Sequence, residues 1–184
     1  MCQPTLICGF AGIGKTQAQR LTPIFGNLWY KQLLDLDSSL YSWCYEEGVR
    51  KERNPMFPFN YVEDIKKLMQ QGRYAYIFIS CHEDVRKLLQ QNKVPYIIVA
   101  PMTDLQNEYM IRYMKRGSGE KFIKTMYSAW YDMHRSIAND SSAKIYLDSG
   151  QYLQDILPPF PRGYTEEEMR MIDNDYVEEY KNAR

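Results

Sequence analysis

The stretch Thr5–Leu21, TLICGFAGIGKTQAQRL, decides the fold that we expect for this chain. It opens with a short apolar run, Leu6–Cys8, which is typical of a buried strand. The run leads into Gly9, four further residues and then Gly14–Thr16, which together match the pattern G-x-x-x-x-G-K-[ST]. When a strand precedes such a loop and a helix follows it, the backbone amides point at one spot that suits a phosphate chain. We therefore expect a strand near residues 5–8, a phosphate-binding loop and a helix from about Lys15.

Each residue of this loop has an expected role in binding a nucleotide. Gly9 permits the turn out of the strand, and Gly12 and Gly14 let the backbone approach phosphate oxygens. Lys15 is expected to reach the β- and γ-phosphates, and the Thr16 hydroxyl is expected to ligate Mg²⁺. The alternative is a glycine-rich turn with a structural role alone. The residues expected to contact the donor nucleotide, ATP, are Gly9, Ala11, Gly12, Ile13, Gly14, Lys15, Thr16 and Gln17.

The composition bounds the class of protein. The 184 residues suffice for one domain with its own core, and the 14% aromatic content argues against disorder. Lys and Arg number 23, as do Asp and Glu, so no overall charge attracts nucleic acid or a membrane. The chain has no apolar run of about eighteen residues and no signal-peptide layout. Its four cysteines show no C-x-x-C spacing, so we expect no zinc site and a cytoplasmic location.

Strand-like and helical patterns alternate along the rest of the chain. The strand-like runs are KQLLDLD (31–37), RYAYIFIS (73–80), VPYIIVAP (94–101) and AKIYLDSG (143–150). Helical patterns occupy residues 61–72, 82–93, both sides of RGSGE (116–120) and 151–157, whereas the prolines of RNPMFPFN (53–60) exclude a long helix. The helix after RGSGE carries an apolar stripe at helical spacing, formed by Phe122, Met126, Trp130, Met133 and Ile137. Five strands separated by helices predict an α/β fold, with a five-stranded parallel sheet, helices on both faces and ligands at the carboxyl ends of the strands.

Two aspartates end the second strand-like run, in LLDLDSS (33–39). Asp35 and Asp37 lie two apart, so their side chains share one face of an extended segment. One of them could hold Mg²⁺ through water, and the other could orient an acceptor hydroxyl or take its proton. The alternative is a helix N-cap or a solvated turn, because Asp and Ser are the usual capping residues. Their position at a strand end favours the functional interpretation, with Asp35 and Thr16 as the expected metal ligands.

The third strand ends in IFISCHED (77–84), where many nucleotide hydrolases carry a metal-binding aspartate. Ser80, Cys81 and His82 occupy that place, which argues against a motor-type or helicase-type ATPase. Ser80 and His82 could contact the nucleotide or the metal, whereas capping of the next helix is an equal alternative for Ser80. Cys81 is expected to be a small buried apolar residue rather than a nucleophile.

A basic segment, YMIRYMKRGSGEKFIK (109–124), follows the fourth strand-like run. Arg112 and Arg116 lie four apart and share a helix face, and three lysines lie nearby. A phosphoryl-transfer enzyme needs mobile cations that neutralise transition-state charge over the γ-phosphate. The break at Gly117–Gly119 would let residues of about 104–125 hinge as a helical lid. The alternative is an ordinary solvated helix face.

A second basic stretch, EEGVRKERNPMFPFNY (46–61), lies between the second and third strands. It places three cations beside three aromatic residues. The cations are Arg50, Lys51 and Arg53, and the aromatic residues are Phe57, Phe59 and Tyr61. Arginine fits phosphate and aromatic rings stack on bases, so the stretch could form an acceptor pocket. Alternatively, the aromatic side chains cover the edge of the sheet.

Together, the loop, the acidic second-strand end and the arginine-bearing helix pair before a last strand resemble a P-loop small-molecule kinase, and most of all the nucleoside and nucleotide monophosphate kinases. The layout FPFNY, IFISCHEDVRKLL, YIIVAP and EYMIRYMKRG is also similar to small kinase-like proteins of bacteriophage genomes. The resemblance spans residues of about 5–157, and its highly specific part is the phosphate loop. It implies a five-stranded parallel sheet, ATP with Mg²⁺, and a lid that closes over the phosphates.

The resemblance implies an ATP-dependent kinase that transfers the γ-phosphoryl group to a nucleotide or nucleoside. Kinases of hydroxyl acceptors use an aspartate near the end of the second strand, whereas monophosphate kinases commonly hold the acceptor phosphate with arginine, and this chain offers both. The alternatives are a kinase of a nucleic-acid hydroxyl or modified base, as in some phage relatives, and a non-catalytic ATP-binding regulatory protein. The zero net charge disfavours a strong duplex binder. The expected catalytic residues are Lys15, Asp35, Asp37, Arg112 and Arg116.

We expect residues 1–160 to form the kinase domain and residues 161–184 to form a polar helical C-terminal tail. The acidic tail could pack on a second copy of the chain, so the sequence is compatible with a homodimer. We expect no membrane partner.

Overall fold

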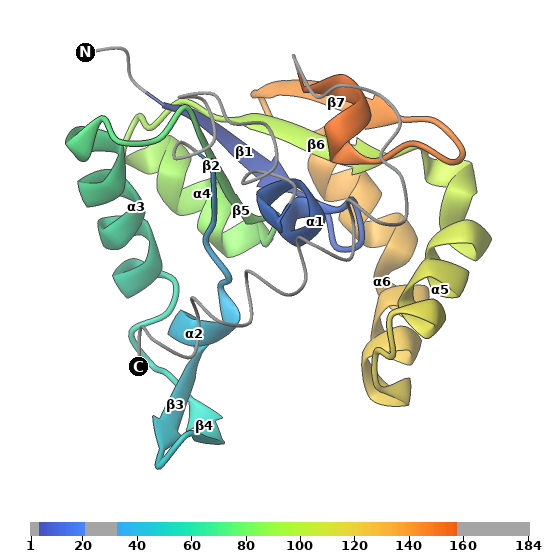
Figure 1. Ribbon diagram of the computed structural model, residues 1–184, viewed down its shortest axis with the longest axis horizontal. Helices are drawn as coiled ribbons and strands as arrows, with labels where there is room; N and C mark the ends of the chain where they lie inside the picture. The colour runs from blue at the N-terminus through green and yellow to red at the C-terminus, as the bar shows by residue number, and fades with distance from the viewer. Residues whose placement is uncertain (1–3, 21–32, 158–184) are drawn as a thin grey trace.

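The computed structural model describes residues 4–20 and 33–157, which fold around a five-stranded parallel sheet (Figure 1). The strand order is β2-β5-β1-β6-β7, so the strand that leads into the glycine loop lies at the centre. The predicted parallel sheet is confirmed, while the predicted tail at 161–184 lies outside the described residues. The strands of this sheet are β1 (Thr5–Gly9), β2 (Leu33–Asp35), β5 (Tyr76–Ser80), β6 (Ile97–Pro101) and β7 (Ala143–Leu147).

The direction of each crossover decides which face of the sheet its helix covers. From β1 the chain passes over β5 to β2 at one edge, whereas every later crossover runs toward β7 at the other edge. Because such crossovers are right-handed, α1 lies on one face and α3, α4 and α6 lie on the other. The contacts agree, since α1 touches α7 while α4 touches both α3 and α6 (Figure 1). The helices are α1 (Lys15–Arg20), α3 (Phe59–Gln71), α4 (Glu83–Gln91), α5 (Gln106–Lys115), α6 (Glu120–Ala138) and α7 (Leu153–Ile156).

An aromatic cluster joins the central strand to α5 and α6. Phe10, which directly follows β1, packs edge-on against Trp130 of α6 at 5.2 Å between ring centroids. Tyr109 of α5 lies 5.6 Å from the same indole, and all three side chains are fully buried. The apolar stripe predicted on α6 is confirmed at Met126, Trp130 and Ile137, which are buried, whereas Met133 is half-buried and Phe122 is 36% exposed. Among the described residues, no helix is long and apolar enough to cross a membrane.

The connection between β2 and α3 contains an antiparallel hairpin that the sequence did not predict. It comprises a short helix, α2 (Ser39–Ser42), followed by β3 (Trp43–Glu46) and β4 (Val49–Arg53). Both turn residues, Glu47 and Gly48, have positive φ, as a type I′ hairpin turn requires. Every residue of β4 is exposed, so the strand lacks the apolar alternation that would mark it in the sequence. In Figure 1 the hairpin and the α5–α6 pair both project beyond the sheet, at the lower left and the lower right.

A buried ion pair ties α4 to the end of α6. Arg86 binds Asp140, and their side chains are only 4% and 2% exposed. The guanidinium also donates to the Ser136 hydroxyl at 2.7 Å, and Asp140 accepts further bonds from Tyr96 at 2.9 Å and from Gln90 at 2.9 Å. These hydrogen bonds offset much of the cost of removing both charges from water, although Arg86 Nε is buried without a partner among the described residues.

We predict that Asp140→Ala lowers the free energy of unfolding by about 3–5 kcal/mol, because it leaves the Arg86 charge buried without a partner. Denaturant unfolding of the wild type and the variant measures this loss. Asp132→Ala is the matched control, since Asp132 pairs with Arg135 at 3.1 Å but both side chains are exposed. The control should cost about 0.5 kcal/mol or less. Equal losses in the two variants would contradict the prediction.

Candidate functional site

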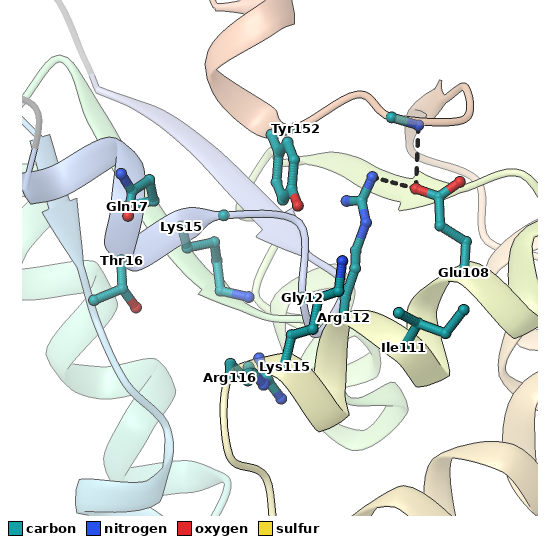
Figure 2. A pocket seen from close by; sticks show the side chains of 12 residues that line it. Gly12, Lys15, Thr16, Gln17, Glu108, Ile111, Arg112, Lys115, Arg116 and Tyr152 are labelled. Carbon is teal, nitrogen blue, oxygen red and sulfur yellow. Dashed lines mark hydrogen bonds and ion pairs between the residues drawn. The ribbon is translucent and has the colours of Figure 1, made fainter. Parts of the chain in front are cut away.

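The candidate site lies in the crevice between the carboxyl ends of β1 and β6. These strands are neighbours, but the chain leaves β1 toward one edge of the sheet and leaves β6 toward the other. Ligands of open α/β sheets bind at such a switch point. A cavity of about 870 Å³ opens there. The loop and the start of α1 line one side, the Arg112–Arg116 face of α5 lines another, and Gly150 and Tyr152 complete the wall (Figure 2).

The backbone of the glycine loop is bent as a phosphate cradle requires. Gly12 and Gly14 have φ values of 82° and 92°, a region that disfavours any residue with a Cβ atom. Within the described chain, no backbone carbonyl accepts a hydrogen bond from the amides of Gly12, Ile13 or Gly14. These donors are therefore left for a ligand. Of the eight residues predicted to contact the donor nucleotide, Gly12, Gly14, Lys15, Thr16 and Gln17 line the cavity, whereas Gly9, Ala11 and Ile13 do not.

Contacts with the core, with α7 and with α5 hold the loop in place. The fully buried Ile13 side chain anchors it in the core, and the Ile13 carbonyl accepts a hydrogen bond from the Leu153 amide at 2.8 Å. The Tyr113 hydroxyl of α5 donates to the Ala11 carbonyl at 3.0 Å. A Cβ atom on Gly12 would lie 2.8 Å from the Tyr113 ring, so the ring packs directly on the loop backbone.

Lys15 folds back over the loop. Its Nζ donates to the carbonyl oxygens of Gly9 at 2.9 Å and Phe10 at 3.1 Å. Burial lowers the pKa of Lys15, and the nearby Asp35 carboxylate opposes this effect. A bound polyphosphate would offer charged oxygens in place of the two neutral carbonyl oxygens. Because hydrogen bonds to charged acceptors are stronger, the ammonium group would turn toward such a ligand.

The structure brings Thr16 and Asp35 together, as expected for a pair of metal ligands. The Thr16 hydroxyl donates to Asp35 Oδ2 at 2.7 Å, and Gln19 Oε1 accepts from the Asp35 amide at 2.8 Å. Burial raises the pKa of Asp35, while Lys15 and the Thr16 hydroxyl oppose the rise. No cluster of three or more His, Cys, Asp or Glu residues that could hold a metal occurs in the part of the chain that the structure describes. One carboxylate and one hydroxyl suit Mg²⁺, which keeps several waters and shares its ligands with phosphates.

Asp37 does not join this pair. Its Oδ1 accepts from the Ser39 amide at 2.8 Å and its Oδ2 accepts from the Ser39 hydroxyl at 2.8 Å. These contacts form an exposed turn directly before α2, whose N-cap position is Ser38, so the structure places Asp37 in the turn that was one alternative for it. The exposed Asp37 carboxylate keeps lone pairs for a ligand, but it does not contact Thr16 or Lys15 through a hydrogen bond.

Ser80 lies opposite Gly9 in the β1–β5 register, at the root of the loop. Its hydroxyl oxygen is buried and has no hydrogen-bond partner among residues 4–20 and 33–157. Buried hydroxyl groups in proteins nearly always have a partner, so this orphan fits a water or ligand oxygen in the loaded site. Ser80 does not cap α4, because His82 holds the N-cap position. Cys81 is half-buried, and the partial loss of water around its thiol raises its pKa to about 11, which agrees with an unreactive side chain.

Arg112 is fixed against the wall of the cavity. Its side chain is 9% exposed and pairs with Glu108, which also accepts from the Ser149 hydroxyl at 2.7 Å and the Gly150 amide at 3.1 Å. Burial would raise the pKa of Glu108, but these hydrogen bonds outweigh it and keep the pKa below its usual value. The Arg112 guanidinium lies 4.0 Å from the centre of the Tyr152 ring (Figure 2). The i,i+4 spacing of Glu108 and Arg112 could have revealed the pair in the sequence, whereas no local pattern indicates Tyr152.

Arg116 lies at the open end of the same face. Its guanidinium covers the rings of Tyr113 at 4.8 Å and Phe122 at 5.2 Å, and its Nε donates to the Ser118 hydroxyl at 2.7 Å. Burial lowers the pKa of Arg116, and its positive charge in turn contributes to the lowered pKa of Lys15. The positive charges of Arg116 and Lys15 therefore both influence the cavity that the two residues line. Lys121 and Lys124 of α6 do not line the cavity.

Two cations of the second basic stretch lie over Trp43 of β3, an aromatic residue outside that stretch. The guanidinium groups of Arg50 and Arg53 lie 4.7 Å and 4.2 Å from the centre of the Trp43 ring. Lys51 instead pairs with Glu46 at 3.4 Å. Burial lowers the pKa of His82, and both Arg53 and Lys15 contribute to the shift. The hairpin face thus reaches toward the carboxyl end of β5, on the side of the loop away from α5. Of the three aromatic residues in the stretch, Phe59 is exposed, whereas Tyr61 is fully buried and Phe57 packs against the core, as the structural alternative predicts for these two.

A scan against protein-family models, a search of curated proteins and a search of solved structures find no match to this chain.

The close contact at Gly12 generates a prediction on stability. Gly12→Ala should lower the free energy of unfolding by about 2–4 kcal/mol, because a Cβ atom adds backbone strain and displaces the Tyr113 ring. Gly48→Ala is the matched control, since Gly48 has a φ of 76° but a Cβ atom there would have no neighbour within 4 Å. It should cost about 1–2 kcal/mol from backbone strain alone. Denaturant unfolding measures both, and equal costs would show that the Tyr113 contact contributes nothing.

Proposed function

We propose that this protein is an ATP-dependent kinase that transfers the γ-phosphoryl group to a nucleotide or nucleoside. The observation that carries the proposal is the convergence of three groups on one crevice. These are the loop amides without backbone partners among the described residues, the Lys15 ammonium group with the Arg116 charge near enough to lower its pKa, and the Thr16 hydroxyl, which binds Asp35 at 2.7 Å. Phosphoryl transfer needs positioning and charge stabilisation more than covalent chemistry, and these groups supply both.

The residues of the chain divide the work of holding the donor. The amides of Gly12–Gly14 would bind phosphate oxygens, and Thr16 and Asp35 would hold Mg²⁺. When bound, Mg²⁺ and ATP supply a neutralising charge and the transferable phosphoryl group. Lys15 and Arg116 stabilise the negative charge of the transition state. Tyr152, with Arg112 held against its ring at 4.0 Å, offers a flat surface for the base.

The movable part of the proposed lid is the turn between α5 and α6. Tyr109 and Tyr113 are fully buried and fix α5 to the loop, so α5 as a whole does not swing away. Gly117 has a φ of 74° with open space around it, and Gly119 is also unobstructed. Arg116 precedes this turn and could move with it to cover the phosphates.

The β3–β4 hairpin is the proposed acceptor side. Arg50 and Arg53 are exposed cations held over Trp43, so they could contact an acceptor phosphate while the ring contacts a base.

A second candidate function, an ATP-binding regulatory protein without transfer, is favoured by a specific observation. The end of β5 carries Ser80 in place of an acidic residue, so the site has a single metal-binding carboxylate, Asp35, among the described residues.

Lys15→Ala should lower the rate of transfer from γ-labelled ATP by at least about 10²-fold while leaving the fold intact, because it removes a cation that acts on the transition state. Lys87→Ala is the matched control, since Lys87 is an exposed lysine of α4 that pairs with Glu83 at 2.6 Å. Its rate and melting temperature should equal those of the wild type. Transfer by Lys15→Ala at the wild-type rate would contradict the proposed mechanism.

The acceptor is tested with a panel of nucleosides, their monophosphates, hydroxymethylated pyrimidines and a short DNA. We predict label on a member of this panel, and Arg53→Ala should raise the KM for that acceptor about tenfold through loss of a charge-assisted contact. Lys51→Ala, on the same strand but paired with Glu46, should leave the KM unchanged. ATP binding without label on any acceptor would instead support the regulatory protein.

A further inference from the structure

A tyrosine hydroxyl lies where the ladder between β2 and β5 ends, between Leu36 and Ser80. In a parallel pair, a residue on one strand donates to one residue of its neighbour and accepts from the residue two positions further on. The Leu36 amide donates to the Phe78 carbonyl at 2.8 Å, so the regular continuation is a bond from the Ser80 amide to the Leu36 carbonyl. Instead, the Ser80 amide donates to the Tyr61 hydroxyl at 3.2 Å, and that hydroxyl donates to the Leu36 carbonyl at 2.6 Å.

Tyr61 reaches this position from the first turn of α3. Its side chain is fully buried, and its ring packs against Tyr41 at 4.9 Å and Phe57 at 5.9 Å between centroids. Burial raises the pKa of Tyr61, so the hydroxyl keeps the proton that it donates to Leu36. The packed ring and two hydrogen bonds leave the hydroxyl no freedom to move aside.

The inserted hydroxyl holds the strand ends further apart than a direct bond would. A direct N–H···O bond spans about 2.9 Å between heavy atoms, whereas two bonds in series span more. The residues next to this junction matter to the site. Leu36 follows Asp35, which binds the Thr16 hydroxyl, and Ser80 carries the buried hydroxyl without a partner.

We propose that Tyr61 is a positioning residue whose hydroxyl sets the separation between Asp35 and Ser80 and thereby the geometry of the metal and phosphate site. The inference rests on the proposed function, because that function assigns Asp35 to the metal site; Ser80 is included because it lies opposite Gly9 at the base of the loop. Tyr61 itself does not touch the ligand. Without the hydroxyl, the ends of β2 and β5 can close into the regular ladder, which displaces Asp35 relative to Thr16. A displacement of about 1 Å at a phosphoryl-transfer site can cost about 10²-fold in rate.

The test is Tyr61→Phe, which keeps the ring and removes the hydroxyl. The affinity for ATP is measured by calorimetry with and without Mg²⁺, together with kcat and denaturant unfolding. We expect unchanged affinity for metal-free ATP, because the loop amides and Lys15 set it. The gain in affinity on adding Mg²⁺ should fall about tenfold or more, and kcat should fall about 10–100-fold.

The matched control is Tyr96→Phe, since Tyr96 is also a buried tyrosine, and its hydroxyl contacts Asp140 far along the chain from the loop. It should lose stability but keep the Mg²⁺ gain and kcat.

A second variant covers the case in which Tyr61→Phe does not fold. Ser80→Ala keeps the amide that binds Tyr61 and removes only the buried hydroxyl, so it should lose part of the Mg²⁺ gain with little loss of stability. A wild-type Mg²⁺ gain and kcat in Tyr61→Phe would overturn the proposal, as would equal losses in Tyr96→Phe. If the wild-type protein binds ATP with Mg²⁺ but transfers no phosphoryl group, the proposed kinase function is contradicted. The gain in ATP affinity on adding Mg²⁺, compared between the wild type and Tyr61→Phe, would still decide the role of Tyr61. Absence of ATP binding by the wild type would overturn both.

Discussion

The packing of the Tyr113 ring on Gly12 is the contact on which the rest of the site depends. It brings the backbone of the loop within van der Waals distance of α5, and the Tyr113 hydroxyl adds a hydrogen bond to the Ala11 carbonyl at 3.0 Å. Arg112 and Arg116 flank Tyr113 in the sequence, so the same contact fixes both arginines relative to the loop. A bulkier residue than glycine at position 12 would break this arrangement, which explains why the loop needs glycine there for packing as well as for backbone conformation.

The sequence predicted the parts of the fold that local patterns determine. The glycine loop, the five parallel strands and the helices on either side of Gly117 follow from short apolar runs, helical spacing and glycine breaks. The contact between Thr16 and Asp35 could also be anticipated, because the carboxyl ends of parallel strands share one edge of a sheet. These features require no knowledge of which distant side chains meet.

Other features depend on long-range contacts that no local pattern encodes. Tyr152 meets Arg112 only because α7 returns to the loop through the Leu153–Ile13 hydrogen bond. The pair Arg86–Asp140 joins residues 54 positions apart. The sequence did not predict the β3–β4 hairpin, because β4 is exposed throughout and its charged residues are also typical of a solvated loop. The separate roles of Asp35 and Asp37 depend on where α2 begins, because Asp37 binds Ser39, the first residue of that helix, in a turn.

The two arginines of α5 are in different electrostatic situations, and this difference bears on their roles. Glu108 neutralises Arg112, and two tyrosine rings and the Gln151 carbonyl at 2.9 Å restrain it. A cation already paired and immobilised adds little new charge stabilisation when a phosphate arrives, so Arg112 is better suited to shaping the wall of the cavity. Arg116 has a neutral partner, Ser118, and lies directly before Gly117. Of the two, Arg116 is the cation that would gain most from a negative charge nearby, because its motion costs one neutral hydrogen bond and two ring contacts but no ion pair.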